Sequence, residues 1–395
     1  MRIDSVSARP IPDTRGKPTI EVAFSAGSLT AKASAPSGKS TGSHEACELR
    51  DSDGSVTTAI ANVNGEIAQA LIGRDFDTPD EIDTLLIELD STRDKSRLGA
   101  NAILATSIAV QRLFAQEADI PLWEAIANRA GTTARAPRLY LNFMNGGVHA
   151  DFKLPFQEYI LVVEGKTSEA LPIAHEAFAK LGERLGDVHM GDEGGYAPAF
   201  AGLEEPFELL DALVTEFQHT AIAIDAAASE FCENGLYRLL GKAYSADELA
   251  QIYKNLSAQF PIHSIEDPFF EDALSDFVKL TATLDGGVLI VGDDLTVTNQ
   301  SRIEAARDAK AIHAVLIKPN QIGSVKEAIE AVQATYAAGF VAIASHRSGE
   351  TNDTFIADFA YGIGAHGIKA GGLGQRERLE KYERLLRIER EAKSV

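Results

Sequence analysis

One unit recurs through the last two thirds of this 395-residue chain: a short apolar run closes in a polar or charged residue and is followed by a helix-like segment. The clearest runs are QEYILVV, AIAIDAAASE, PIHSIEDP, GVLIVGDDL, AVLIKPN, FVAIASHRSGE and HGIKAGG. Apolar strands that alternate with helices are typical of a parallel sheet covered on both faces. This many units in about 260 residues is the size of a β/α barrel.

The first third of the chain has a different pattern of apolar and polar residues. TIEVAFSAG and LTAKASAPSG alternate apolar and polar residues, which predicts two antiparallel strands joined at Gly27 and Ser28. Three later segments space apolar residues as helices do: residues 56–73, 79–90 and 101–118. We therefore predict an α/β chain with an N-terminal α+β domain at 1–126, a polar linker at 127–137 and a TIM-like barrel at 138–395.

Charge and composition narrow the possible partners. The net charge of −21 argues against a surface for nucleic acid, because duplex binding depends on clustered lysine and arginine. No run reaches the ~20 apolar residues that a membrane helix needs, and the chain opens without a signal-like segment. Two cysteines without metal-like spacing suit a reducing compartment. We expect a cytoplasmic protein that neither binds nucleic acid nor spans a membrane.

Charged side chains close the predicted barrel strands, and barrel active sites form at the carboxyl ends of strands. The residues at these ends are Asp225, Glu266, Asp267, Asp293, Asp294, Lys318, His346, Arg347 and Lys369. Each acid alone is more often a solvated loop residue, but acids at equivalent places on three strands would repel one another unless a cation joined them. Oxygen ligands suit Mg²⁺, and no HExxH arrangement points to zinc.

Lys318 ends a run that reads as buried on both faces. Its ammonium could extend to water at the strand end, which by position alone is the commoner situation, or it could serve catalysis. Arg347 and Ser348 offer a guanidinium and a hydroxyl that suit an oxyanion such as phosphate. The two lysines at strand ends, Lys318 and Lys369, would then face a bound substrate.

The chain also resembles the enolase family along nearly its whole length. The motifs that carry the resemblance, in the family's order, are DTRGKPTIEV, APSGKSTGSHEA, LGANAIL, LNFMNGGVHA, FQEYI, GDEGGYAP, IDAAASEF, SIEDPF, VGDDLTVTN, IKPNQIGS, SHRSGET, IKAGG and KYERLLRIE. The resemblance implies a carbon–oxygen lyase that reversibly dehydrates 2-phosphoglycerate to phosphoenolpyruvate in glycolysis and gluconeogenesis. It also implies Mg²⁺, two ions per active site, of which the second arrives with substrate.

The resemblance assigns roles to matched positions. Lys318 matches the base that removes the proton beside the carboxylate, and Glu193 matches the acid that assists hydroxide departure, with Glu158 beside it. The matched metal ligands are Asp225, Glu266 and Asp293, with Ser40 for the second ion. The implied substrate contacts are His149, Glu266, Asp293, His346, Arg347, Ser348 and Lys369.

A base lysine must be neutral, so we expect burial and neighbouring cations to lower the pKa of Lys318.

The chain departs from the family at Lys39, where a small residue is usual in the loop of Ser40. A homodimer or a higher homo-oligomer is implied, with Glu21 and Arg387 preserving one ionic pair, whereas Arg390 stands where an acid is usual. These departures leave two alternatives open: a paralogue acting on a related phospho- or phosphono-carboxylate, and a non-catalytic binding protein on the same scaffold.

Overall fold

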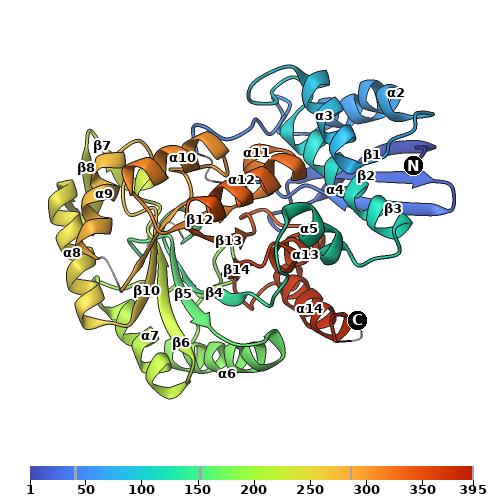
Figure 1. The fold of residues 1–395 in the computed structure, drawn as a ribbon. Helices are drawn as coiled ribbons and strands as arrows, with labels where there is room; N and C mark the ends of the chain where they lie inside the picture. Colours follow the sequence, from blue (N-terminus) through green and yellow to red (C-terminus); the bar gives the residue numbers. More distant parts are fainter. Residues whose placement is uncertain (40–41, 151–153, 285–286, 394–395) are drawn as a thin grey trace.

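The computed structural model describes residues 1–39, 42–150, 154–284 and 287–393 and contains an N-terminal domain beside a barrel (Figure 1). The N-terminal domain begins with an antiparallel sheet in the order β1-β2-β3. Its elements are β1 (Ser5–Pro12), β2 (Pro18–Ala26), β3 (Leu29–Ser34), α1 (Thr57–Asn62), the π-helix η1 (Val63–Ile67), α2 (Ala68–Leu71), α3 (Pro79–Asp90), α4 (Ala100–Glu117) and α5 (Leu122–Ala130). The predicted α+β character of this domain is confirmed.

Local sequence signals explain these elements. Gly27 takes a positive φ of 60° at the turn between β2 and β3, a conformation that glycine adopts without steric cost. Ile20, Val22 and Phe24 of β2 are buried, and the sheet packs against α4. The predicted linker overlaps α5, which continues to Ala130.

The second domain contains a closed barrel with the strand order β10-β11-β12-β13-β14-β4-β5-β6. Its strands are β4 (Arg138–Asn145), β5 (Glu158–Val163), β6 (Thr220–Asp225), β10 (Ile262–Glu266), β11 (Leu289–Gly292), β12 (Ala314–Ile317), β13 (Val341–Ser345) and β14 (Gly367–Lys369). Seven of these strands coincide with the seven apolar runs of the sequence, and β4 is the eighth. The predicted barrel is confirmed.

Strand β5 contradicts the prediction of a wholly parallel sheet, because it pairs antiparallel with both β4 and β6. No long helix separates β4 from β5 in the described part of that connection, and a parallel return requires such a crossover. The reversal places the start of β5 at the end of the barrel where its neighbours finish. Glu158 consequently lies in register with Asn145 of β4 and Asp225 of β6.

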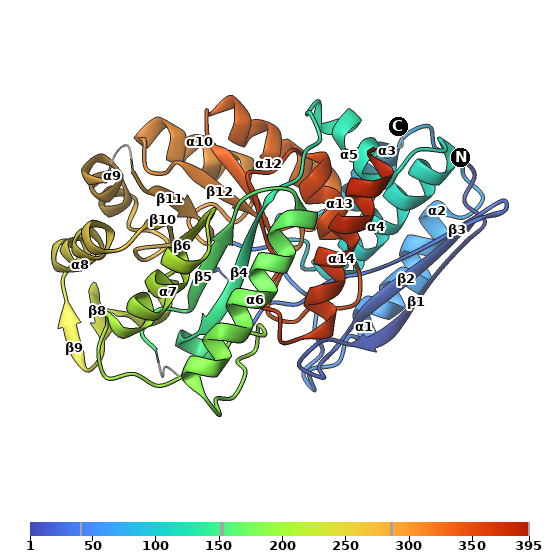
Figure 2. The same ribbon diagram turned by 90° about the horizontal axis from the view of Figure 1, so that it is seen from below.

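Helices surround the barrel (Figures 1 and 2). They are α6 (Thr167–Leu185), α7 (Glu205–Glu216), α8 (Ala246–Gln259), α9 (Leu274–Thr283), α10 (Gln300–Ala309), α11 (Pro319–Ile322), α12 (Val325–Ala337), α13 (Phe355–Gly362) and α14 (Arg376–Glu391). Two 3₁₀ turns, η2 (Gly147–Ala150) and η3 (Ala228–Phe231), follow β4 and β6, and a small sheet contains β7 (Cys232–Glu233), β8 (Leu236–Leu239) and β9 (Lys242–Tyr244). Among the described residues, no helix combines the length and apolar character needed to cross a membrane.

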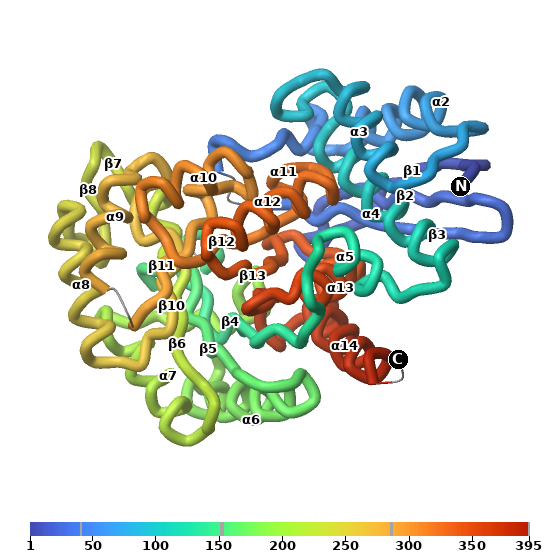
Figure 3. The backbone as a smooth tube through the Cα atoms, in the orientation of Figure 1, coloured from blue at the N-terminus to red at the C-terminus, as the bar shows by residue number. Residues whose placement is uncertain are grey.

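Two segments that are distant in the sequence lie close to the barrel. The blue segment after β3 leaves the N-terminal domain and runs beside α10 and α11 (Figure 3), and Ala46 there donates its backbone N–H to the carbonyl of Gln321. The C-terminal helix α14 packs between α6 and α13 (Figure 2). The barrel interior is itself filled by side chains, among them Tyr140, Val162 and Leu316.

Candidate active site

Lys369 lies at the centre of a buried cluster of carboxylates. Its Nζ is 2.9 Å from Asp225 Oδ2, and 2.8 Å from both Glu266 Oε1 and Glu158 Oε2. Burial would lower the pKa of Lys369, but the neighbouring carboxylates, Asp225 first among them, raise it well above its usual value. Three strands therefore supply acids to one lysine that ends a fourth strand, and this lysine stays charged.

Lys318 pairs with Asp293, which follows the neighbouring strand β11. The other carboxylate oxygen of Asp293 accepts from Gln321 Nε2 at 2.8 Å. The expectation for Lys318 is wrong for the protein by itself: burial lowers its pKa, but the charge of Asp293 outweighs burial, and the pKa rises to about 12. A role as base therefore requires that Asp293 be engaged by another cation, or that Lys318 leave it.

Glu193 lies between two histidines in the loop after α6. Its Oε1 is 3.5 Å from His149 Nε2 and its Oε2 is 3.7 Å from His346 Nε2, while Asn142 Nδ2 donates to Oε2 at 3.1 Å. Burial would raise the pKa of Glu193, but the two histidines and a hydrogen bond with Glu158 hold it well below its usual value. Burial and the charge of Glu193 raise the pKa of Glu158. The opposite shifts of this interacting pair favour a proton on Glu158 rather than on Glu193.

Arg347 is buried in the same site and forms a two-pronged ion pair with Glu45 of the N-terminal segment. Arg347 Nη1 is 2.7 Å from Glu45 Oε2, and Nη2 is 3.2 Å from Oε1. Ser348 Oγ accepts from Arg15 Nη1 at 3.3 Å. Sequence analysis did not identify Glu45 and Arg15 as site residues. Both lie within the motifs that carry the family resemblance, but their spacing does not indicate that they contact Arg347 and Ser348 of the barrel.

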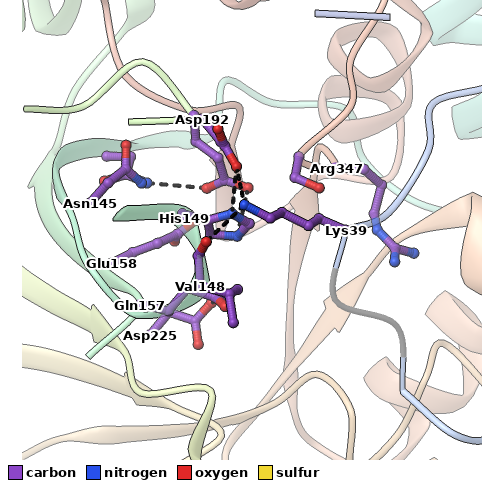
Figure 4. A network of polar contacts seen from close by, with 12 residues as sticks. Lys39, Asn145, Val148, His149, Gln157, Glu158, Asp192, Asp225 and Arg347 are labelled. Carbon is purple, nitrogen blue, oxygen red and sulfur yellow. Dashed lines mark hydrogen bonds and ion pairs between the residues drawn. The ribbon is translucent and has the colours of Figure 1, made fainter. Parts of the chain in front are cut away.

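The segment before Ser40 reaches the same place (Figure 4). Lys39 Nζ donates to the carbonyl of Val148 at 2.8 Å and to Asp192 Oδ2 at 2.6 Å. A hydrogen bond with His149, aided by Lys39, lowers the pKa of Asp192 to about 2. Ser40 itself lies outside the described residues.

The acids of this site suit a hard divalent cation. Burial and mutual repulsion raise the pKa of Glu266, with Asp225 as the first contributing charge. Asp267 and Asp294 show the same rise in pKa, with burial as the leading cause and neighbouring aspartates next. A bound cation would relieve this repulsion, so the donor set fits Mg²⁺.

The described residues offer two possible positions for such a cation, and neither is formed by the three ligands that the family resemblance implied. Within the described residues, two groups bring three ligand atoms within 4.8 Å of one another: Glu158, Glu193 and His346, and Asp267, Asp293 and Asp294. The implied trio of Asp225, Glu266 and Asp293 is not among these groups, because lysines lie between its members: Lys369 between Asp225 and Glu266, and Lys318 on Asp293.

Nine of the predicted residues line one small cavity. It is bounded by charged and polar side chains, including Glu158, Glu193, Lys318 and Lys369. His149, Asp225, His346, Arg347 and Ser348 complete the predicted part of its wall. Glu266 and Asp293 reach this group through their ion pairs with the two lysines. A cavity with this charged and polar lining suits a small anionic metabolite.

Comparison with known proteins assigns both domains. Residues 134–395 match the family model described as Enolase, C-terminal TIM barrel domain, and residues 3–126 match Enolase, N-terminal domain. The enolase of Methanopyrus kandleri is 44% identical over 409 residues, which cover 98% of this chain and 95% of the relative. The enolase of Methanosarcina mazei is 44% identical over 416 residues, covering 100% and 96%. Enolase 1 of Methylococcus capsulatus is 44% identical over 409 residues, covering 98% and 97%.

Proposed function

The chain belongs to the enolase family, and from this premise we propose that it reversibly dehydrates 2-phosphoglycerate to phosphoenolpyruvate, in glycolysis and gluconeogenesis. It is a carbon–oxygen lyase. The observation that carries the proposal is the full-length similarity to proteins named enolase, combined with one polar cavity that gathers two lysines, two histidines and several acids.

Lys318 is the proposed base. The proton beside an ionised carboxylate is weakly acidic, because its removal creates a dianionic enediolate, so the site must stabilise negative charge. The neutral amine of Lys318 would accept this proton, and Lys369, on the second strand after it in the barrel order, would stabilise the developing charge. The pairing of Lys318 with Asp293 must first be relieved, since it favours the charged ammonium.

Glu193 and Glu158 form the proposed acid. Loss of the hydroxyl group as water requires a proton, and the two carboxyls share one within hydrogen-bonding contact. Glu193 would receive this proton from Glu158 and deliver it to the leaving oxygen, and solvent would return a proton to the pair before the next turnover. His149 and His346 flank Glu193 and would orient it.

The remaining predicted residues would hold the substrate. We assign the phosphate to Arg347 and Ser348, because a guanidinium and a hydroxyl suit a phosphoryl group. Binding at Arg347 must compete with Glu45 or share the guanidinium with it. His346, Lys369 and His149 complete the set of proposed substrate contacts.

Mg²⁺ is the cofactor that the family implies, and the acids of the site suit it. We propose that Asp225, Glu266 and Asp293 hold one ion and that Ser40 joins a second ion when substrate binds. Bound Mg²⁺ would stabilise charge on the substrate carboxylate and remove the Coulombic effect of Asp293 that raises the pKa of Lys318. A lysine or histidine base working beside Mg²⁺ is the established pattern of the enolase superfamily, and Lys318 follows it.

We also propose a cytoplasmic homodimer. Arg9 and Glu21 pair with each other at 2.7 Å on the N-terminal sheet, and with Glu377 they line a groove beside α14. A second copy could approach there, with its Arg387 facing Glu21. Sedimentation velocity at low and high salt would test this, and a monomer at micromolar concentration in both would contradict it.

Ultraviolet absorbance of the conjugated enol product tests the proposed reaction. Purified protein with 2-phosphoglycerate and Mg²⁺ should produce a rising signal that a chelator abolishes and added Mg²⁺ restores. The Lys318→Ala variant should bind substrate but fail to exchange the C2 proton with solvent. Absence of a Mg²⁺-dependent signal from folded wild-type protein would contradict the proposal, and activity on a phosphono-carboxylate instead would favour the paralogue.

A further inference from the structure

Arg378 of α14 is wholly buried beside the active site, and the proposed mechanism does not use it. Its Nε donates to Gln375 Oε1 at 2.7 Å, and its Nη2 donates to the carbonyls of Asp192 and Ser348, both at 3.0 Å. Its Nη1 donates to His346 Nδ1 and to the carbonyl of Arg347, the latter at 3.3 Å. Five acceptors therefore match the five N–H donors of a guanidinium.

None of these five acceptors is a carboxylate. Among the residues that the structure describes, no acidic side chain lies within ion-pair distance of Arg378. A buried charge without an adjacent counter-ion is costly, so five well-placed acceptors around this guanidinium point to a role beyond simple packing. Gly371 accommodates this side chain, because a Cβ atom at that position would lie 2.2 Å from Arg378 Cδ.

The contact with His346 determines where the imidazole carries its proton. A guanidinium has only donors, so His346 Nδ1 must accept, and a neutral ring then carries its hydrogen on Nε2. Nε2 faces Glu193 Oε2 at 3.7 Å. A second proton on Nδ1 would place one N–H against another. Arg378 therefore selects the imidazole tautomer that presents a donor to the proposed catalytic acid.

Arg378 also connects the two loops that carry the site. The carbonyls of Arg347 and Ser348 belong to the loop after β13, while the carbonyl of Asp192 precedes Glu193 in the loop after α6. Gln375 reinforces this connection, because its Nε2 donates to the same Asp192 carbonyl at 3.1 Å. One guanidinium thus sets the separation between the loop of Glu193 and the loop of the proposed phosphate contacts.

We infer that Arg378, supported by Gln375, is a positioning residue that holds His346 with its Nε2–H toward Glu193 and ties together the loops of the active site. The kinetic part of this inference rests on the proposed function. The tautomer of His346 does not, because it is a property of the protein without turnover. Failure of the inference is therefore distinguishable from failure of the proposed reaction.

The test compares Arg378→Met, which removes every donor, with Arg376→Met on the same helix. Arg376 is a matched control because its side chain is 85% exposed and pairs only with Glu380 within the described residues. Protein labelled with ¹⁵N-histidine reports ring tautomers, and His346→Gln identifies the signal of His346 among the nine histidines. Wild type and Arg376→Met should show the Nε2–H form, and Arg378→Met should lose this single form.

Kinetics and chemical rescue complete the test. Arg378→Met should lower kcat by about 100-fold or more, as misplacement of an acid–base group does, with a smaller change in KM. Guanidinium chloride at non-denaturing concentration should restore part of the activity of Arg378→Ala, while equal sodium chloride should not. An unchanged His346 tautomer in folded Arg378→Met, or a kcat equal to that of Arg376→Met, would overturn the inference.

A second variant covers the case in which Arg378→Met does not fold. Gln375→Met removes the acceptor of Arg378 Nε and one donor to the Asp192 carbonyl while leaving the guanidinium in place. It should broaden or shift the His346 signal in the same direction by a smaller amount, with a smaller loss of kcat. A wild-type His346 signal together with wild-type kcat in this variant would count against the inference.

Discussion

The ion pair between Glu45 and Arg347 joins the two domains inside the active site, and its replacement should be costly. The side chains are 7% and 4% exposed, and both guanidinium nitrogens contact the carboxylate. Glu45→Gln preserves the shape but removes the negative charge, which deprives the buried guanidinium of Arg347 of the carboxylate that it contacts with both terminal nitrogens. Breaking a buried pair in this way costs about 3 to 5 kcal/mol, a large part of the ~5–15 kcal/mol that stabilises a typical native protein.

A second pair in the N-terminal domain isolates the contribution of burial. Glu66 and Arg97 have the same two-pronged geometry, at 2.8 and 3.0 Å, but their side chains are 44% and 41% exposed. Glu66→Gln should therefore change stability little, because water screens and replaces an exposed pair. The contrast between the two variants tests burial rather than the number of hydrogen bonds.

Urea unfolding followed by tryptophan fluorescence and circular dichroism measures both variants. Glu45→Gln should lower the transition midpoint well beyond Glu66→Gln, with little change in the slope. Inorganic phosphate should then stabilise Glu45→Gln more than the wild type, because the anion would contact Arg347 in place of the removed Glu45 carboxylate. Equal midpoints for the two variants would refute the argument from burial.

Two further predictions concern charged groups near the ends of the barrel. His263 Nε2 and His366 Nε2 lie 3.2 Å apart, and burial lowers the pKa of both rings, that of His366 to about 4. Since the unfolded rings bind protons first, the contribution of this pair to stability should be complete above about pH 6.5 and decline toward pH 4, and His366→Gln should flatten that part of a plot of Tm against pH. A slope that His366→Gln leaves unchanged would contradict this. Lys39→Ala should leave Tm nearly unchanged, because the pair of Lys39 with Asp192 is partly exposed, but it should raise KM and reduce the salt dependence of kcat/KM. A salt dependence equal to that of wild type would remove Lys39 from the substrate region.

Much of the architecture was predictable because the signals are local. A strand buried on both faces requires a continuous apolar run, and seven of the eight barrel strands follow that rule. The closing residues of those runs lie at one end of the barrel, so Asp225, Glu266, Lys318 and Lys369 were identifiable from their positions. The direction of β5 was not predictable in this way, because an apolar run has the same composition in either direction.

Glu158 illustrates the resulting limit. It starts a strand rather than ending one, so the strand-end rule excludes it, and only the family resemblance indicated it. The reversal of β5 brings it to Lys369. The pKa of Lys318 shows a similar limit. Its burial, which lowers the pKa, was predictable from the sequence, but the contact with Asp293, which raises the pKa, was not.

The sequence by itself determined the element types, the barrel and most of the chemical groups at its active end, because these depend on residue order within each unit. Tertiary structure alone decided the partners of those groups. Glu45 meets Arg347 and Arg378 meets His346 across separations of 302 and 32 residues. Such contacts depend on how whole segments pack. Packing brings donors and acceptors within hydrogen-bond distance, but it produces no periodic pattern in the sequence from which the contacts could be predicted.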